Sequence, residues 1–554
     1  MECPEIYDEK ARDFILEQDG IYSGKEPIQS ACNQFLGNGY YAVYTTKENQ
    51  PPLNMENYTY SAIPEGYSLL GREAWEASCM IPIMNNPVLN LDGTGVIFGI
   101  VDTGLNVSSP AFRYIGGATR VLAYWDQTNK DGPAPDEFLY GREYRREEID
   151  ELLQQERFQE LPRDEIGHGS YLTAIAAATK RRGSNDYGAA HQCELAVVKL
   201  KQAKQYLRDY YFVGSEVPFY QENDIMAGVY YLHMLAQKEN KPLVLCVGLG
   251  TNMGNHKGSS NLARQLSALS GLRQRMVICA AGNEALRRHH YKGVLLQQGA
   301  KEVVEINVGE NVPGFYVQLW SDAPQLFHVD VIAPSGEVLI GVESRDTGQV
   351  SKRFRIENTL VRQDNRLLAT KDGQQLISTV FTQPIEGIWR VEITADVATT
   401  GIYHMWLPME EQLQGEVIFI RSDPDYTVTE PGNAPVILTT GAYNSRNNTI
   451  YLQSGRGYTA SEQIKPELCA PGVEVAEEYG NELRTGTSVA AACMAAASIL
   501  YIQWAVYNRG ADSITGAFVK TVLIQGANTQ PNRSYPNREW GYGQLCLERS
   551  IQGR

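Results

Sequence analysis

The chain has 554 residues, which is more than one hydrophobic core usually holds, so we expect two to four domains. Hydrophobic residues make up 43% of the chain and charged residues 21%, a composition typical of soluble globular proteins. The formal net charge of −16 argues against nucleic acid or an anionic membrane as the main binding partner.

The first residues and the cysteines bear on the compartment. Residues 1–5 contain neither a basic segment nor an apolar one, so they predict no secretory signal. No run of about 18 uninterrupted apolar residues is present, which predicts no transmembrane helix. The nine cysteines are scattered and lie mostly in apolar runs, as Cys246, Cys279 and Cys493 do. We interpret them as buried free thiols rather than a disulfide framework, in a protein made in the reducing cytoplasm.

Residues 1–71 are predicted to form a small separate unit of α+β character. Within residues 31–44 the dipeptide Asn38-Gly39 is a hairpin turn signal, and alternating apolar residues follow it. We expect the unit to end in an extended tail over residues 67–70.

From about residue 72 the pattern becomes α/β. The apolar runs 96–101, 242–247 and 276–281 are continuous, as expected of strands buried on both faces. Such strands between helical segments predict a mostly parallel sheet flanked by helices. A charged helix is predicted from about residue 145 to 159, with its charges in solvent.

The pattern changes again over residues 291–430. Apolar and polar residues alternate in several short runs separated by turn residues, for example over 327–331 and 389–393. This period of two predicts an antiparallel β-sandwich, for which a jelly roll is the expected form. After about residue 431 the α/β character returns, with a predicted strand at 435–438 and an apolar, buried helix over 488–507.

Three motifs together indicate nucleophilic catalysis. Asp102 follows a buried strand, where parallel sheets place functional groups. His168 stands between two glycines at the start of a predicted helix, and Ser488 begins the apolar helix within Gly-Thr-Ser. A serine hydroxyl needs a base within hydrogen-bond reach, and that base needs an orienting carboxylate. The order Asp, His, Ser along the chain is that of subtilisin.

Two further segments suit the handling of a peptide substrate. Asn283 follows a buried strand, and its side-chain amide is suited to donate a hydrogen bond to the oxyanion of a tetrahedral intermediate. The small residues of Gly248-Leu249-Gly250 leave room for a substrate backbone to pair as an extra strand. Each motif alone has an ordinary explanation, such as a turn, a helix cap or a packing strand. Their joint occurrence in this order indicates a protease.

These segments resemble the subtilisin-like serine peptidases of family S8 and, within them, the Csp group of germination proteases of clostridia. The resemblance rests on VIFGIVDTG, DEIGHGSYLTAIAAA, ICAAGNE and TGTSVAAACMAA, and it covers roughly residues 72–290 and 431–554. The gap from Asp102 to His168 is 66 residues and that from Asn283 to Ser488 is 205. Subtilisin numbering gives about 32 and about 66. The charged helix accounts for the first excess and the inserted β-domain for the second.

The resemblance implies a domain organisation and a maturation step. Residues 1–71 would be a prodomain that acts as intramolecular chaperone and inhibitor, and residues 291–430 a jelly-roll insertion between the two parts of the catalytic domain. The tail of the prodomain would lie in the active site, be cut by the protein itself within about residues 66–72, and remain bound. The sequence departs from the usual family pattern at Ser170, Tyr171, Ala492 and Gly248, and none of these changes removes a proton-transfer group.

The predicted function is that of a serine endopeptidase made as a zymogen. Ser488 would attack the scissile carbonyl, and His168 would take up the proton. Asp102 would hold the imidazole, and Asn283 would stabilise the oxyanion. No cofactor and no metal are expected. By resemblance, the substrate would be the precursor of a spore cortex-lytic enzyme.

The expected partners are a protein substrate and the chain's own prodomain, with no nucleic acid and no membrane insertion, in a monomer packaged in the spore. The adjacent His289 and His290 are interpreted as a solvated loop rather than metal ligands. Two alternatives stay open. One is a general bacterial peptidase outside germination, and the other is a pseudoprotease that serves as a binding or signalling scaffold.

Overall fold

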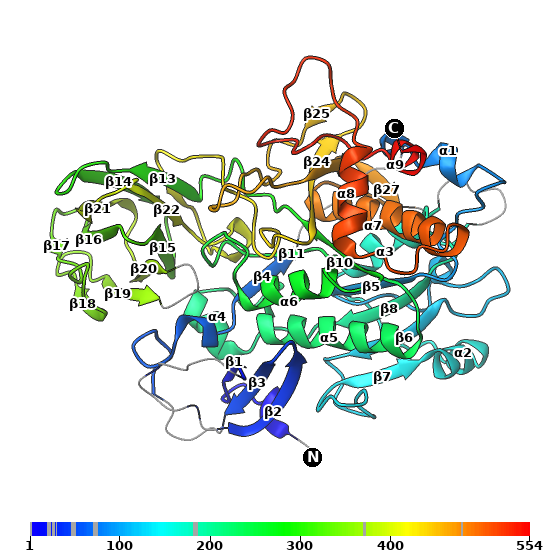
Figure 1. Cartoon of the computed structure of the whole chain (residues 1–554). Helices are drawn as coiled ribbons and strands as arrows, with labels where there is room; N and C mark the ends of the chain where they lie inside the picture. Colours follow the sequence, from blue (N-terminus) through cyan, green and yellow to red (C-terminus); the bar gives the residue numbers. More distant parts are fainter. Residues whose placement is uncertain are drawn as a thin grey trace.

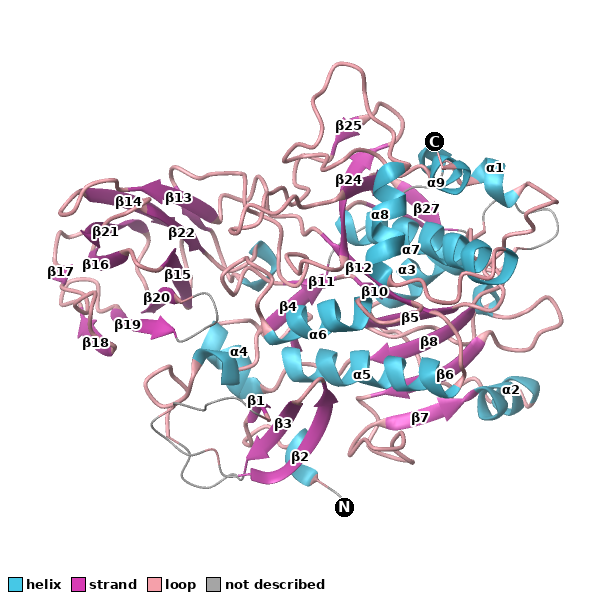
Figure 2. Cartoon of the chain, viewed as in Figure 1, coloured by secondary structure: helices cyan, strands magenta, loops and turns pink. Residues whose placement is uncertain are grey.

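The computed structural model describes residues 3–18, 24, 28, 30–45, 51–69, 76–180, 187–368, 373–477 and 480–553. Three bodies of secondary structure are seen: a small N-terminal sheet, a central sheet covered by helices, and a pair of antiparallel sheets that lies on the left in Figures 1 and 2. The central body therefore has the N-terminal sheet on one side and the paired sheets on another.

The central sheet is mostly parallel, as predicted. Its strand order is β25-β24-β12-β10-β5-β8-β6-β7, with β26 paired to β24. Only the edge strands β7 and β25 run antiparallel to their neighbours. The strands are β5 Ile97–Asp102, β6 Val121–Asp126, β7 Arg142–Arg145, β8 Glu194–Lys199, β10 Leu243–Val247, β12 Arg275–Ala280, β24 Leu438–Asn444, β25 Thr449–Ile450 and β26 Leu468–Pro471.

Helices cover both faces of this sheet, α3 and α7 on one face and α5 and α6 on the other (Figure 1). Successive side chains of a strand point to opposite faces. In β5, Phe98 and Ile100 therefore join the core with α3 and α7, whereas Ile97 and Val101 join the core with α5 and α6. The helices are α1 Ile81–Met84, α2 Arg146–Gln154, α3 His168–Ala177, α4 Gln205–Tyr211, α5 Glu222–Lys238, α6 Asn261–Ser270, α7 Thr487–Gln503, α8 Gly516–Gln525 and α9 Leu547–Gln552.

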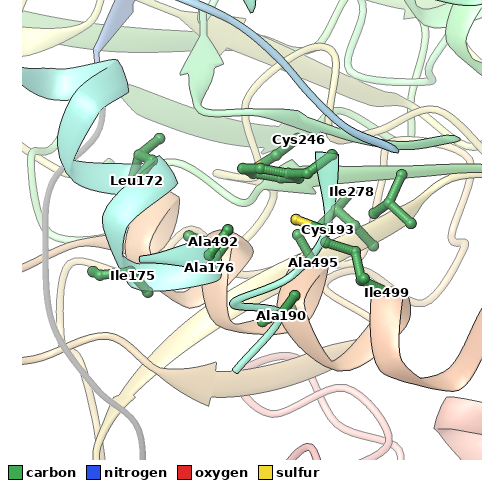
Figure 3. Close-up of a cluster of buried hydrophobic side chains, with 14 of the residues drawn as sticks. Leu172, Ile175, Ala176, Ala190, Cys193, Cys246, Ile278, Ala492, Ala495 and Ile499 are labelled. Atoms are coloured by element: carbon green, nitrogen blue, oxygen red, sulfur yellow. The ribbon is translucent and has the colours of Figure 1, made fainter. Parts of the chain in front are cut away.

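Small side chains separate α3 from α7. Figure 3 shows Ala176 of α3 beside Ala492 and Ala495 of α7, in the core that also holds Cys246 and Ile278 of the sheet. Because these side chains are small, the two helices pack closely. The first turns of both helices lie at the same end of the sheet. Residues 487–508 are long and apolar enough to cross a membrane, but 94% of the apolar window is buried inside the protein, as in a core helix.

Two predicted elements differ from the observed ones. The predicted strand at 435–438 is wrong, because β24 begins only at Leu438. The carbonyl oxygens of Pro435 and Ile437 instead accept hydrogen bonds from Lys520 Nζ at 2.7 and 3.2 Å, so they are used by an ammonium group and not by a neighbouring strand. The charged helix α2 ends at Gln154 rather than near residue 159.

The paired antiparallel sheets form between β12 and β24, which are neighbours in the central sheet. Their strand orders are β13-β22-β15-β20-β19-β18 and β17-β16-β21-β14-β23, and large side chains such as Phe315, Phe381 and Trp389 fill the core between them. The strands are β13 His290–Val294, β14 Lys301–Val308, β15 Gly314–Asp322, β16 Leu326–Ile332, β17 Val338–Leu339, β18 Gly348–Arg353, β19 Leu360–Leu368, β20 Gln374–Thr382, β21 Gly387–Val397, β22 Ile402–Trp406 and β23 Val417–Phe419.

The N-terminal sheet contains β1 Asp13–Glu17, β2 Ser30–Gly37 and β3 Tyr40–Thr45. The predicted hairpin turn is confirmed, because Asn38 and Gly39 join β2 to β3 and both have positive φ angles, of 52° and 80°. In the described part of residues 1–71 the helical residues form only short 3-10 turns, so the helical half of the α+β prediction is not seen there.

The N-terminal region has a fourth strand, β4 Gly66–Leu69, which lies outside the small sheet and packs against the central body. It pairs antiparallel with β11 Leu249–Gly250 on one side and with β9 Tyr220–Gln221 on the other. The extended tail is therefore confirmed as far as Leu69, and residues 70–72 of the predicted cleavage window lie outside the described residues. The remaining pair, β27 Val475–Glu477 and β28 Gly480–Arg484, is a short hairpin.

The prediction that all cysteines are free thiols is wrong for four of them. The structure pairs Cys3 with Cys32, and Cys79 with Cys546, as disulfides. Their sequence separations of 29 and 467 residues do not resemble a compact framework, which is why spacing alone did not reveal them. Five buried cysteines remain thiols outside the disulfides, as predicted: Cys193, Cys246, Cys279, Cys469 and Cys493.

Candidate active site

The structure brings Asp102, His168 and Ser488 together at one end of the central sheet. Asp102 is the last residue of β5 and is fully buried. Its Oδ1 lies 2.7 Å from Nδ1 of His168, so Nε2 of the same ring is left facing the Ser488 Oγ, at 3.4 Å. The second distance is at the outer limit of a hydrogen bond, and such contacts are often long before a substrate is bound.

Close packing at the start of α3 sets the position of His168. A Cβ atom added at Gly169 would lie 2.3 Å from the carbonyl oxygen of Gly104 and 3.2 Å from the Asp102 Cβ, so only glycine fits here. The N–H of Gly169 donates to Thr103 Oγ1 at 2.9 Å. The first turn of α3 is thereby held directly against the loop that follows Asp102.

The carboxylate of Asp164 caps this same turn. Its Oδ1 accepts the N–H of Gly167 at 2.8 Å, and its Oδ2 accepts the N–H and the hydroxyl of Ser170 at 2.9 and 2.8 Å. A carboxylate at a helix start also complements the helix dipole. Ser170, one of the departures from the family pattern, thus has a structural part in positioning His168.

Ser488 is the second residue of α7 and is fully buried. The free N–H groups of the first turn of a helix favour negative charge near this position. Gly248 lies beside both His168 and Ser488, because a Cβ atom added there would be 3.2 Å from Cε1 of His168 and 3.3 Å from Cβ of Ser488. Space for a substrate main chain beside the serine therefore depends on the glycine.

Asn283 follows β12 and points its side-chain oxygen at the start of α7. Oδ1 accepts the N–H of Thr487 at 3.1 Å and the Thr487 hydroxyl at 3.3 Å. A backbone N–H is always a donor, so the atom facing it must be the oxygen. The Asn283 amide nitrogen is consequently the end directed away from Thr487, and its N–H groups are the donors that an oxyanion role would use.

The predicted substrate-binding residues Gly248, Leu249 and Gly250 border the catalytic groups. Leu249 pairs with Leu69, and Gly250 pairs with Ser68. A Cβ atom added at Gly250 would lie 2.5 Å from Oγ1 of Thr429, so this strand too requires a glycine. The N-terminal strand β4 thus occupies the edge of β11 that an extended peptide would use.

Several residues of the site were not singled out from the sequence. Thr103, Asp164 and Thr487 act only through hydrogen bonds to the groups named above, and threonine and aspartate at helix starts are too common to indicate a site. Asp164 lies within the segment DEIGHGS, and its place four residues before His168 is the one signal that was available.

The interpretation of His289 and His290 as a solvated loop is wrong. Both side chains are buried: His289 Nδ1 lies 2.6 Å from Glu284 Oε2, and His290 stacks against Trp406 and contacts His404 Nδ1 at 2.9 Å. Their burial comes from packing between the paired sheets and the central body, which joins residues far apart in sequence.

Among the described residues, one group suited to a metal lies in the paired sheets. It consists of His328, Glu343 and Asp396, whose ligand atoms are within 4.8 Å of one another. Another lies in the N-terminal unit, where Cys3 and Cys32 are already joined as a disulfide near Glu5. Neither group includes a residue of the catalytic set.

Comparison with known proteins agrees with this geometry. The subtilase family model matches residues 93–335 and 411–543, more than half of the chain. The CspB protease of Clostridium perfringens is similar, with 27% identity and a TM-score of 0.75 over 86% of this chain and 97% of that one.

Two further solved structures match at lower similarity. The prenylagaramide maturation protease PagA has 12% identity and a TM-score of 0.39, over 84% of this chain and 98% of that one. MycP1 from Mycobacterium smegmatis has 13% identity and a TM-score of 0.36, over 88% and 89%. Among curated proteins none matches. The family match over most of its length, with the likeness to CspB, shows that this chain belongs to the subtilase family and is a CspB-like serine endopeptidase.

Proposed function

We propose that this protein is a self-processing endopeptidase that uses Asp102, His168 and Ser488 as its catalytic triad and Asn283 as an oxyanion donor. The single observation that carries the proposal is the docking of β4, a strand of the protein's own N-terminal region, against β11 beside the triad. Such docking is the arrangement that self-cleavage requires.

The chemistry follows from the contacts. As Ser488 Oγ attacks a carbonyl carbon, its proton passes to His168 Nε2, and the imidazolium is stabilised by Asp102 at Nδ1. The oxyanion accepts hydrogen bonds from the Asn283 amide and the Ser488 N–H. His168 then gives its proton to the leaving amine, and water releases the acyl group in a second round of the same steps.

The register of β4 bears on where the chain is cut. Ser68 lies opposite Gly250 and Leu69 opposite Leu249, so the strand runs toward Gly248, where an added Cβ atom would contact both His168 and Ser488. We therefore assign the cleaved bond to the part of the 66–72 window that follows Leu69.

Residues 1–71 would then be a prodomain that stays bound after cleavage. A buried ion pair supports this: Asp13 Oδ1 lies 2.5 Å from Lys204 Nζ, and both side chains are almost fully buried. Gln221 and Asn223 donate to the other carboxylate oxygen at 3.1 and 3.3 Å. Asp13 belongs to the N-terminal unit and its three partners to the central body, so these contacts form only while the unit is bound.

The remaining parts of the proposal rest on similarity to CspB. The catalytic domain would comprise residues 72–290 and 431–554, with residues 291–430 as a jelly-roll insertion. The protein would act as a monomer on a protein substrate, the precursor of a spore cortex-lytic enzyme, and would be packaged in the spore.

The test is the intact mass of the wild-type protein beside Ser488→Ala. We expect two fragments that remain together in the wild type, with the cut in the part of the 66–72 window that follows Leu69, and a single full-length chain in the variant. If both proteins stay full length, self-processing is refuted, and the chain is either a pseudoprotease or a protease that awaits an external activator. Cleavage of the cortex-lytic precursor by the wild type alone would separate the germination role from that of a general peptidase.

A further inference from the structure

Glu222 holds the main chain of the N-terminal region at two points just before β4 begins. Its N–H donates to the carbonyl oxygen of Glu65 at 2.9 Å, and its carboxylate Oε2 accepts the N–H of Glu65 at 3.4 Å. Its other oxygen accepts the N–H of Leu262 at 2.9 Å, which fixes the carboxylate at the start of α6. Both contacts with residue 65 involve main-chain atoms and so do not depend on its side chain.

These contacts continue the hydrogen-bonded ladder of β4. Gly66 pairs with Gln221, the residue directly before Glu222, and Leu69 pairs with Leu249 beside the triad. Residues 65–69 are therefore held along their whole length, from Glu222 at one end to β11 at the other.

We propose that Glu222 is a substrate-positioning residue that clamps the main chain of a protein substrate four residues before the residue that pairs with Leu249. The inference rests on the proposed function, in which β4 takes the place of a substrate strand. It means that the enzyme reads an extended segment of at least five residues on the N-terminal side of the cut, and that short peptides miss the clamp.

Three carboxyl groups from separate parts of the chain meet at the clamp. Glu65, Glu222 and Glu430 are 5%, 1% and 0% exposed. Glu65 and Glu430 both flank Gly254, where an added Cβ atom would lie 3.3 Å from Oε1 of the first and 3.5 Å from Cγ of the second. Glu430 itself accepts hydrogen bonds from the Gly258 N–H at 3.1 Å and the Ser260 hydroxyl at 3.3 Å.

The charges around this cluster make the clamp sensitive to pH. Burial raises the pKa of Glu222 to about 7, and its effect outweighs the hydrogen bonds from the N–H groups of Leu262 and Glu65 and the charge of Arg264, all of which lower that pKa. Burial, together with the charge of Glu222, raises the pKa of Glu430 to about 7, and Lys465 opposes this. Three buried tyrosines, Tyr60, Tyr211 and Tyr316, also face Glu65, and burial together with the Glu65 charge raises the pKa of each; the Tyr60 hydroxyl lies 3.4 Å from Glu65 Oε1.

The clamp is more stable at low pH than at high pH. An ordinary glutamate has a pKa of about 4.3, and water would return Glu222 and Glu430 toward that value when the clamped segment leaves. The clamped form therefore binds protons more tightly than the open form. Its stability is complete at acid pH and is lost as the pH rises through about 7.

Hydrogen–deuterium exchange of the full-length Ser488→Ala protein tests the clamp without requiring catalysis. The readout is the protection of amides 65–69 at pH 6 and pH 8, corrected for intrinsic exchange rates, with amides 97–102 of β5 as an internal control for global stability. We expect protection of residues 65–69 to fall about tenfold at pH 8 relative to pH 6.

Two variants in this background separate the clamp from the charge. Glu222→Ala removes the carboxylate contact and should lower protection of residues 65–69 by about tenfold at both pH values. Glu430→Gln is isosteric and keeps both of its partners, because its oxygen can accept from Gly258 and its amide can donate to Ser260. It removes the neighbouring charge, so protection should fall less than threefold between pH 6 and pH 8, about a third of the parental change.

Unchanged protection in Glu222→Ala, or an unaltered pH profile in Glu430→Gln, would overturn the proposal. If Glu222→Ala also loses protection in β5, Glu222→Gln decides instead, because it retains an oxygen for residue 65 and should show the flattened pH profile. Failure of the wild type to cut itself would refute the proposed function and leave this measurement unaffected. With Ser488 intact, Glu222→Ala should slow the appearance of the cleaved fragments.

Discussion

Removal of the Asp13 carboxylate should release the N-terminal unit from the self-processed protein. Asp13 is fully buried, and its partner Lys204 is 2% exposed, so Asp13→Ala leaves a buried ammonium group without its counter-charge. Burial already lowers the pKa of Lys204, which shows that its charge is costly to desolvate. Breaking such a pair typically costs about 3–5 kcal/mol, which corresponds to a dissociation constant raised between about a hundredfold and a few thousandfold.

The assay is size-exclusion chromatography of the processed protein over a dilution series, with mass spectrometry to detect the N-terminal fragment in the main peak. Lys10→Ala is the matched control, because Lys10 is an exposed residue of the same unit. The fragment should dissociate from Asp13→Ala at a concentration at least about a hundredfold higher than from the control. If both variants retain it to the same dilution, the ion pair does not hold the unit in place, and the reasoning from burial fails.

Three other changes have defined outcomes. Asn283→Ala should lower kcat by about 10²–10³-fold with little change in KM, and a raised KM with an unchanged kcat would contradict an oxyanion role. Gly169→Ala should abolish activity and lower the melting temperature, because the added Cβ would lie 2.3 Å from a carbonyl oxygen, whereas Gly116→Ala, with open space around it, should behave as wild type. Burial lowers the pKa of His256 to about 4, below its ordinary value of about 6.5, so the unfolding free energy should fall as the pH drops through this range. His256→Phe should remove up to about 1.4 kcal/mol per pH unit of that slope in chemical denaturation, and an unchanged slope would show that His256 is not the group responsible.

Structure and function are predicted best from the sequence at positions where burial or close packing permits only one type of residue. The apolar run before Asp102 has no polar face because both faces of β5 are buried, and its end is therefore a reliable place to look for a functional group. Gly169 is similar, because no other residue fits between α3 and the Gly104 carbonyl. The candidate triad could be assembled from such positions.

Other features depend on contacts between distant segments. Glu222 is the first residue of an amphipathic helix, where acidic residues are common, so the sequence does not single it out. Its further role is seen only in the structure, where its carboxylate accepts the N–H of Glu65. Cys79 and Cys546 lie 467 residues apart, so no local spacing signals their pairing. Likewise His290 is buried by Trp406, which belongs to a strand more than a hundred residues later.

The position of α7 near the end of the chain has a consequence for biosynthesis. Chains emerge from the ribosome N-terminus first, so β4 and its sheet are made long before Ser488. In the proposed function, Asp102 and His168 are already present by then, but they would have no nucleophile to activate until α7 packs against α3. The first peptide beside the completed centre would then be the protein's own β4. Such a nascent protease would be blocked from cutting neighbouring chains on the polysome.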